Sequence, residues 1–292
     1  MQSIENEELR IGVNELGGSL TSIFEKKKNI EHLYQPSPKA WQGQDVFIFP
    51  MIARLVDSTY TISGKEYEFK NHGLIRYMTG ACQKDNGDLK IVFHSEQETL
   101  KRYPFQFKAE AVYHLEGKTL SVSYHIYNED QKDMPFMVGG HPAFMLPGVE
   151  KEDFFDIRGN YITFPKKLKL VRIRQEETFS FNLEDEDFME TDHIDLSKEL
   201  FADKNTIILK ADDFEELSLH KKDGSMITMN KNKAKYLALW SGNEWGNFIA
   251  IEPWNGIPDY VNPNKDFYQK PGVQVIKPNE EYIFSYSITI AD

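Results

Sequence analysis

The chain has 292 residues, of which 40% are hydrophobic and 27% are charged, and this composition excludes a disordered or fibrous protein. Its formal net charge of −12, with Lys and Arg spread along the chain, excludes a nucleic-acid-binding class, because such binding depends on phosphate neutralisation. The single cysteine, Cys82, excludes an intrachain disulfide and favours a reducing compartment.

The N-terminal segment Met1–Arg10 is acidic and lacks the apolar core that a signal peptide needs. The densest apolar stretch, Val46–Ala53, is too short to span a bilayer as a helix, and it contains Pro50. We therefore expect a cytoplasmic protein with no membrane partner and no nucleic-acid partner.

Alternation of apolar and polar residues is the main pattern along the chain, and it is the period of a half-buried strand. It is clearest in Phe107–Leu115 and Thr119–Asn128, and Glu116-Gly117 between them predicts a hairpin turn. Further strands are predicted at Leu89–Phe93, Thr206–Leu209, Glu216–His220, Met226–Met229, Tyr236–Trp240, Phe248–Glu252 and Tyr282–Ile290.

Helical patterns are scarce, and only Asp195–Leu200 predicts a short turn of helix. Without a regular alternation of strands and helices, a parallel doubly wound sheet is not expected. The acidic stretch Leu183–Asp192 is the best candidate for a solvated loop. The many aromatic and β-branched residues favour an all-β fold. We expect one domain over residues 1–292, built from two stacked antiparallel sheets.

The short signatures of serine hydrolases, nucleotide hydrolases, Rossmann dehydrogenases and zinc enzymes are missing from the chain. The chain has no CxxC or HExxH pattern, so no metal site is predicted. It also has no GxSxG elbow and no GxGxxG fingerprint. Gly117-Lys118-Thr119 resembles the end of a P-loop, but Val112 stands where the first glycine belongs, and the segment is predicted to be a hairpin.

Polar residues stand among apolar and turn-forming neighbours in a few segments. In GGHPAF, two glycines precede His141 and a proline follows it, which holds the histidine at a stiff strand end. In IEPWNG, Glu252 ends an apolar run, so its carboxylate must be paired, hydrogen-bonded or raised in pKa. Trp254 beside it could stack on a sugar ring. Arg54 in FPMIARL and His72 in NHGLIR complete the set.

Each residue also has a structural alternative when it is taken alone. A buried histidine can bind a carbonyl, a buried carboxylate can accept backbone hydrogen bonds, and an arginine can form an ordinary ion pair. The order R…HG…GGHPAF…IEPW is more specific, and it resembles the aldose 1-epimerase family, the galactose mutarotases. The likeness is greatest to the LacX-like branch, and it extends from about Asn14 to the C-terminus.

This resemblance implies a β-supersandwich fold and a free sugar as the ligand. On the matching positions, it implies that His141 is the general acid and Glu252 the general base. It also implies substrate-binding roles for Arg54, His72 and an aspartate, for which Asp203 is the best match.

Anomer exchange opens and recloses a cyclic hemiacetal, so it needs an acid and a base but no redox or metal cofactor. We expect His72, His141 and Glu252 to surround one cleft, with an aromatic wall from Trp254, Phe49 or Phe144. Three alternatives stay open: a hexose-6-phosphate epimerase of the same superfamily, a non-catalytic sugar-binding protein, and a glycosidase, which needs a second carboxylate. The sequence identifies neither the sugar nor the oligomeric state.

Overall fold

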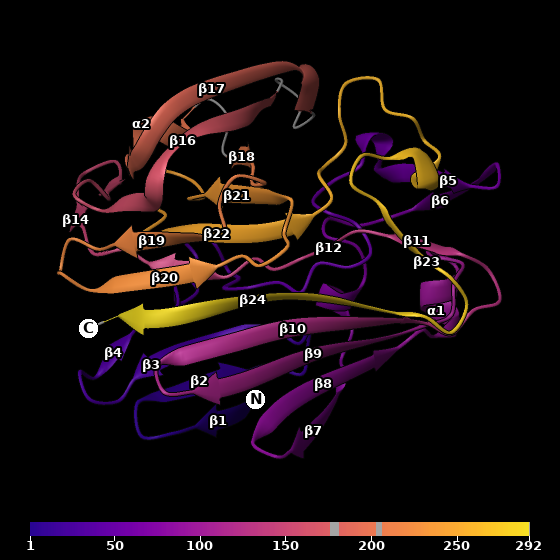
Figure 1. The fold of residues 1–292 in the computed structure, drawn as a ribbon, viewed down its shortest axis with the longest axis horizontal. Coiled ribbons are helices and arrows are strands. Elements are labelled where there is room, and N and C mark those ends of the chain that lie inside the picture. The colour runs from indigo at the N-terminus through magenta and orange to yellow at the C-terminus, as the bar shows by residue number, and fades with distance from the viewer. Residues whose placement is uncertain (176–180, 203–205, 292) are drawn as a thin grey trace.

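The computed structural model describes residues 1–175, 181–202 and 206–291, and strands dominate these ranges (Figure 1). Within them, 14 strands join one large sheet, so the prediction of an all-β fold with large antiparallel sheets is confirmed. Its strands are β7 (Ala81–Asp85), β8 (Asp88–His94), β9 (Phe107–Glu116), β10 (Thr119–Asn128), β12 (Val138–Gly139), β13 (Ala143–Met145), β16 (Tyr161–Gln175), β17 (Phe181–Asp195), β18 (Thr206–Lys210), β19 (Glu216–His220), β20 (Met226–Asn230), β21 (Tyr236–Trp240), β22 (Phe248–Asn255) and β24 (Glu281–Ala291).

The large sheet runs in the order β12-β22-β21-β18-β16-β19-β20-β24-β10-β9-β8-β7, with β13 paired to β22 and β17 paired to β16. Its strands alternate as predicted: on β10, Leu120, Val122 and Tyr124 are buried, while the residues between them are partly or fully exposed. The prediction of two stacked sheets gave no boundary between them, and the large sheet is continuous, because the long strand β16 pairs with both β18 and β19.

The N-terminal residues form a second antiparallel sheet in the order β1-β2-β3-β4, beside the β10–β9–β8 part of the large sheet (Figure 1). The Tyr113 hydroxyl on β9 donates to the carbonyl of Gly18, and one hydrophobic core extends from Leu9 to Ile290. The remaining strands are β1 (Gln2–Glu5), β2 (Leu9–Val13), β3 (Leu20–Glu25), β4 (Ile30–Glu31), β5 (Thr59–Ile62), β6 (Lys65–Glu68), β11 (Met134–Phe136), β14 (Val149–Glu150), β15 (Phe155–Asp156) and β23 (Gln274–Ile276).

Helices are short throughout the described ranges. They are α1 (Gln97–Leu100), α2 (Lys198–Phe201) and the 3-10 turns η1 (Val56–Ser58), η2 (Ile75–Tyr77) and η3 (Phe267–Gln269). The helix predicted at Asp195–Leu200 is thus displaced, because Ser197 caps α2 by accepting the Leu200 N–H, at 3.3 Å. No helix in these ranges is long and apolar enough to cross a membrane.

The loop predicted at Leu183–Asp192 is wrong, because this segment lies inside the edge strand β17, which pairs only with β16. The acidic side chains that the structure describes in this segment remain at the surface, where several of them face basic residues of neighbouring strands. Asp187 pairs with Arg172, and Glu186 pairs with Lys210. An edge strand covered with charge has no apolar alternation, so the pattern of the sequence could not reveal it.

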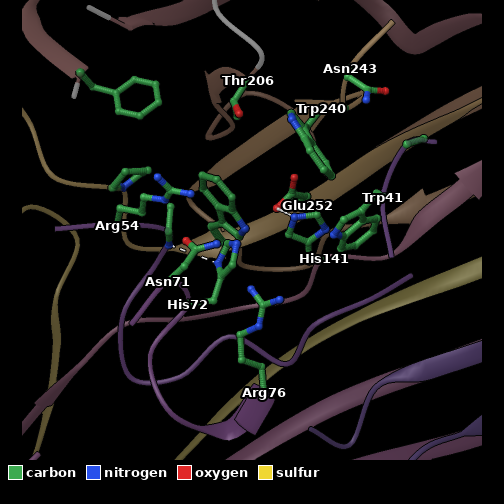
Figure 2. Close-up of a pocket in the computed structure, with 16 residues that line it drawn as sticks. Trp41, Arg54, Asn71, His72, Arg76, His141, Thr206, Trp240, Asn243 and Glu252 are labelled. Carbon is green, nitrogen blue, oxygen red and sulfur yellow. Dashed lines mark hydrogen bonds and ion pairs between the residues drawn. The ribbon is translucent and has the colours of Figure 1, made fainter. Parts of the chain in front are cut away.

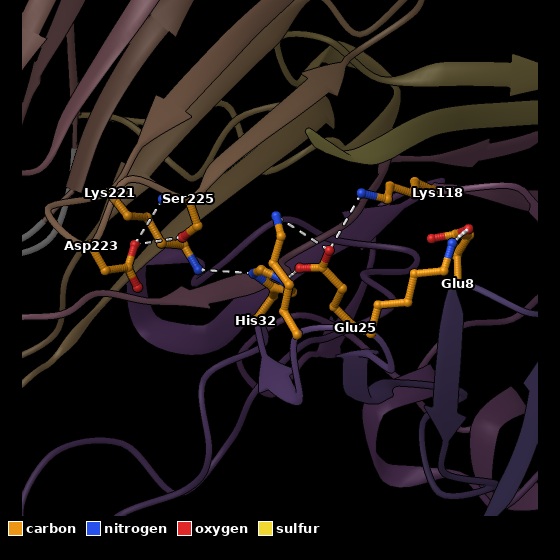
Figure 3. A network of polar contacts seen from close by, with 9 residues as sticks. Glu8, Glu25, His32, Lys118, Lys221, Asp223 and Ser225 are labelled. Atoms are coloured by element: carbon orange, nitrogen blue, oxygen red, sulfur yellow. Dashed lines mark hydrogen bonds and ion pairs between the residues drawn. The ribbon is translucent and has the colours of Figure 1, made fainter. Parts of the chain in front are cut away.

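A buried polar network ties the N-terminal sheet to the β19–β20 hairpin (Figure 3). His32 Nε2 lies 3.2 Å from Glu25 Oε2, and Lys221 Nζ lies 3.4 Å from His32 Nδ1. Because an ammonium can only donate, Nδ1 accepts and Nε2–H donates to Glu25. Lys28 and Lys118 each place Nζ 3.4 Å from Glu25 Oε1. Every polar atom of the His32–Glu25 pair therefore has a partner.

The network fixes the charges of its members. Burial, followed by the charge of Lys221, lowers the pKa of His32 to about 4. Burial alone would raise the pKa of Glu25, but the His32 hydrogen bond and the charges of Lys28 and Lys118 lower it. Glu25 is therefore an anion and His32 is neutral near neutral pH.

Candidate functional site

A cavity of about 440 Å³ opens at the surface where several segments distant in the sequence meet. His72, His141 and Glu252 line it together with Arg54 (Figure 2). Trp254 lines it as well. The sequence prediction that the two imidazoles and the carboxylate surround one cleft therefore agrees with the structure.

The two residues before His141 pack so closely against neighbouring strands that only glycine fits at both positions. A Cβ on Gly139 would lie 2.5 Å from the Trp254 ring, and one on Gly140 would lie 2.6 Å from the Tyr286 ring. Glycine at both positions lets the backbone lie directly against β22 and β24. The Gly140 N–H donates to the carbonyl of Pro253, at 3.1 Å. The GGHP motif therefore allows neighbouring strands to approach closely, and it places the His141 ring in the cleft.

Glu252 lies on β22, all of whose residues are buried. Its Oε2 atom is 3.2 Å from His141 Nε2 (Figure 2), although the two groups are not aligned as a hydrogen bond. Burial raises the pKa of Glu252 well above its usual 4.5, and the charge of Asp45 raises it further, against a smaller opposite effect of the Trp254 N–H. Burial, with a contribution from Arg76, lowers the pKa of His141 to about 3.

These opposite shifts mean that the pair holds a single proton over a broad pH range. Removing this proton leaves a buried carboxylate, and adding a second proton leaves a buried imidazolium, and both charged states are costly to bury. Among the described residues, His141 Nδ1, Glu252 Oε2 and Trp254 Nε1 are buried without a hydrogen-bond partner. Unsatisfied buried polar atoms are rare, and here three of them line or adjoin one cavity, which is typical of a ligand site.

His72 has a defined tautomer. The backbone N–H of Ala53 donates to His72 Nδ1 at 3.2 Å, and the backbone N–H of His72 donates to the Ala53 carbonyl at 2.8 Å. Burial lowers the pKa of His72 well below 6.5, with smaller effects from nearby cationic groups, so the ring is neutral and carries its proton on Nε2. A Cβ on Gly73 would collide with the carbonyl of Phe49, so only glycine allows the two segments to join this way.

Two arginines line the cleft, and the sequence analysis singled out only Arg54. Arg76 ends the NHGLIR segment, and its guanidinium points toward His72 and His141 (Figure 2). Its charge lowers the pKa of both imidazoles. Among the residues the structure describes, Glu252 is the only carboxylate that lines the cavity.

The aromatic wall differs in part from the prediction. Trp254 lines the cleft, but Phe49 and Phe144 lie fully buried in the core and do not. Trp41 and Trp240 line it instead, with ring centroids 5.0 Å and 5.6 Å from the His141 ring. Neither tryptophan stands in a segment with an unusual pattern, so the sequence offered no signal for them.

The predicted substrate-binding residue Asp203 lies outside the described residues. Asn71, Thr206 and Asn243 also line the cleft, and sequence reasoning missed all three. Their amide and hydroxyl groups suit hydrogen bonds to a polyhydroxylated ligand. In the described ranges, no three His, Cys, Asp or Glu side chains gather closely enough to hold a metal ion.

Comparisons with known proteins agree with this geometry. Residues 1–289 match the sequence profile of the aldose 1-epimerase family. The plasmid-encoded protein LacX of Lactococcus lactis subsp. lactis is 30% identical over 302 aligned positions, which cover 98% of each chain.

Solved structures show the same fold. A galactose mutarotase related enzyme from Lactobacillus acidophilus superposes with a TM-score of 0.91 at 27% identity, over 100% of this chain and 97% of that one. A galactose mutarotase-like protein from Lactobacillus casei superposes with a TM-score of 0.92 at 25% identity, over 100% of both chains.

Proposed function

The chain belongs to the aldose 1-epimerase family, and we propose that it interconverts the α and β anomers of a free aldose of the galactose or glucose type. The observation that carries this proposal is the buried His141–Glu252 pair, which faces a cleft with its two groups 3.2 Å apart. The pair holds one proton and so combines an acid and a base at one place.

In the empty site the single proton of the pair lies on Glu252. The proposed reaction begins when sugar binding moves this proton to His141, which leaves Glu252 as the carboxylate and His141 as the imidazolium. Glu252 takes the proton of O1, and His141 gives a proton to the ring oxygen as the bond between C1 and that oxygen breaks. The product is an open-chain aldehyde, whose C1–C2 bond then rotates. The hydroxyl attacks the other face of C1, its proton returns to His141, and Glu252 returns its proton to O1. Each such proton transfer typically contributes ~10²–10⁴-fold to the rate.

The other cleft residues support binding and charge stabilisation in this proposal. His72 offers the N–H at Nε2, and Arg54 offers its guanidinium, to sugar oxygens. Trp41 and Trp240 offer apolar faces to the C–H side of a sugar ring, beside His141. Substrate hydroxyls would also supply hydrogen bonds to the buried Glu252 carboxylate, which favours its ionised form.

Polarimetry of freshly dissolved α-anomers of galactose, glucose and other aldoses tests the proposal, with buffer alone as the blank. We expect the protein to accelerate the approach to equilibrium rotation for at least one free aldose. Sugar binding without acceleration would instead identify a sugar-binding protein.

A hexose-6-phosphate epimerase is the second candidate, and the two arginines of the cleft favour it. Arg54 and Arg76 face a cavity whose only described carboxylate is Glu252, so the cavity suits a ligand with an anionic group. The comparison to make is kcat/KM for glucose against glucose 6-phosphate. A preference for the phosphorylated sugar that disappears in Arg76→Met would support this candidate over the free aldose.

A further inference from the structure

A buried carboxylate behind the catalytic pair has no role in the reaction as described so far. Asp45 is 5% exposed and lies in the segment before Val46–Ala53. Its Oδ2 accepts the N–H of Leu20 at 2.8 Å. Among the described residues, no Lys, Arg or His side chain pairs with it. A buried aspartate held only by backbone N–H groups is unusual, because buried charges are generally paired.

Asp45 contacts the catalytic segment directly. Its Oδ1 accepts the N–H of His141 at 3.3 Å, so a single side chain bridges β3 and the backbone of the predicted acid. Gly140, next to His141, already has the Tyr286 ring beneath it and its N–H bound to Pro253. The Asp45 hydrogen bond holds the next backbone N–H, that of the residue whose ring faces the cleft.

The second contact is electrostatic. Asp45 is near enough to Glu252 for its negative charge to raise the pKa of that carboxyl. Burial raises the pKa of Asp45 itself to about 6, and its backbone hydrogen bonds oppose this effect. Near neutral pH, Asp45 is therefore a buried anion.

We propose that Asp45 is a positioning residue of the anomerisation reaction: it fixes His141 through the backbone and places a negative charge near Glu252. This inference rests on the proposed function. The charge of Asp45 makes Glu252 a stronger base toward the O1 proton. It also disfavours ionisation of Glu252 while Asp45 is ionised in the empty site. The pair therefore retains its single proton to higher pH than Glu252 could hold it alone.

Other groups around the two carboxylates also bear on this titration. Glu252 faces His141 and the Trp254 N–H, and His72, Arg54 and Arg76 line the same cleft. The phenols near Asp45 are Tyr113, Tyr124 and Tyr286, whose pKa values burial raises well above 10, so they stay neutral throughout.

The first experiment is the pH profile of kcat/KM for the full chain with Asp45→Asn. Loss of the charge lets Glu252 ionise more easily, so the alkaline limb should move about one pH unit lower. A weaker base should also lower kcat by less than about ten-fold, with KM little changed. Glu25→Gln, another buried carboxylate outside the cleft, is the control and should leave the profile in place. A lower melting temperature with an unchanged profile would overturn the proposal.

A second measurement uses the wild-type protein, and it applies even if Asp45→Asn does not fold. In carboxyl ¹³C NMR, the Asp45 carbon should show its own inflection and a second one where Glu252 titrates. In Glu252→Gln the second inflection should vanish. A single inflection in the wild type would overturn the proposal. Because this readout needs no catalysis, absent mutarotation would contradict the proposed function but not the Asp45–Glu252 coupling.

Discussion

Two buried His–Glu pairs occur in this molecule at the same separation, and their surroundings make them opposite in character. His32 and Glu25 lie 3.2 Å apart inside the network that joins the N-terminal sheet to the β19–β20 hairpin. His141 and Glu252 also lie 3.2 Å apart, at the wall of the cleft. Residue type and distance therefore do not distinguish a structural pair from a candidate catalytic one.

The difference lies in the remaining polar atoms. Two lysines complete the coordination of Glu25 and lower its pKa, and Lys221 occupies the second nitrogen of His32. No described lysine pairs with Glu252. Its pKa is raised by burial, and the negative charge of Asp45 raises it further. A fully partnered pair has nothing left to offer a ligand, whereas the pair at the cleft retains both a proton and the atoms to exchange it.

The largest expected effect is that of Glu252→Gln, which keeps the shape of the side chain but removes its capacity to accept a proton. Mutarotation should fall by ~10²–10⁴-fold in polarimetry, while sugar affinity changes little. Its melting temperature should not fall, because Gln replaces a carboxyl that burial keeps neutral. Full activity in a folded Glu252→Gln protein would show that Glu252 is not the base.

The next effect concerns pH and the structural pair. The pKa of His32 is about 4 in the folded protein and 6.5 in an unfolded chain, so the unfolded state binds more protons between these values. His32 thus makes the free energy of unfolding decrease as pH falls from 6.5 to 4, by on the order of 3 kcal/mol. In His32→Gln this contribution disappears, so urea unfolding across the window should show a weaker pH dependence than in the wild type. Equal dependence in both proteins would contradict the assignment.

Glu25→Gln is the same chemical change as Glu252→Gln, made in the other pair. It leaves Lys28 and Lys118 without their anion and disturbs the His32 hydrogen bond, so the free energy of unfolding should fall by about 1–3 kcal/mol. Mutarotation at a temperature where the variant is folded should match the wild type. A large loss of kcat in Glu25→Gln would erase the distinction between the two pairs.

The smallest effect is expected for Trp41, in the aromatic wall of the cleft beside the His141–Glu252 pair. Trp41→Leu removes a ring that lies against His141 while leaving an apolar side chain. If the indole stacks on the sugar, KM should rise about two- to ten-fold, the range that an aromatic contact of ~0.5–1.5 kcal/mol gives. The kcat value should change little. Phe188→Leu, at an exposed aromatic residue of β17 that does not line the cleft, is a suitable control.

Strand prediction succeeded where one face of a strand is buried and the other is not. β9, β10, β19, β21 and β24 fall within one residue of their predicted bounds at each end. The charged edge strand β17 was not predicted, because it is stabilised by strand pairing and cross-strand ion pairs rather than by an apolar face. The sequence also could not show that β16 connects what looked like two separate sheets.

Prediction of the site divided along a similar line. His141, Glu252 and His72 stand beside glycine or proline, and these residues mark where the backbone must turn or approach closely, so the sequence reveals them. Trp41 and Arg76 reach the cleft only through tertiary packing, and no local pattern marks them. Asp45 acts through a backbone N–H of a residue 96 positions away, a relation that only the folded chain displays.

The pairing of β12 with β22 sets a condition on when the protein can become active. Val138 lies opposite Asn255, and Gly139 opposite Trp254, so the His141 turn is held by a strand more than a hundred residues later. Contacts this distant in sequence form late and slowly in folding, because they require closure of a long loop. A nascent chain released before β22 would contain His72 and His141 but no assembled site. Recovery of the proposed mutarotation during refolding would therefore report when β12 and β22 have paired.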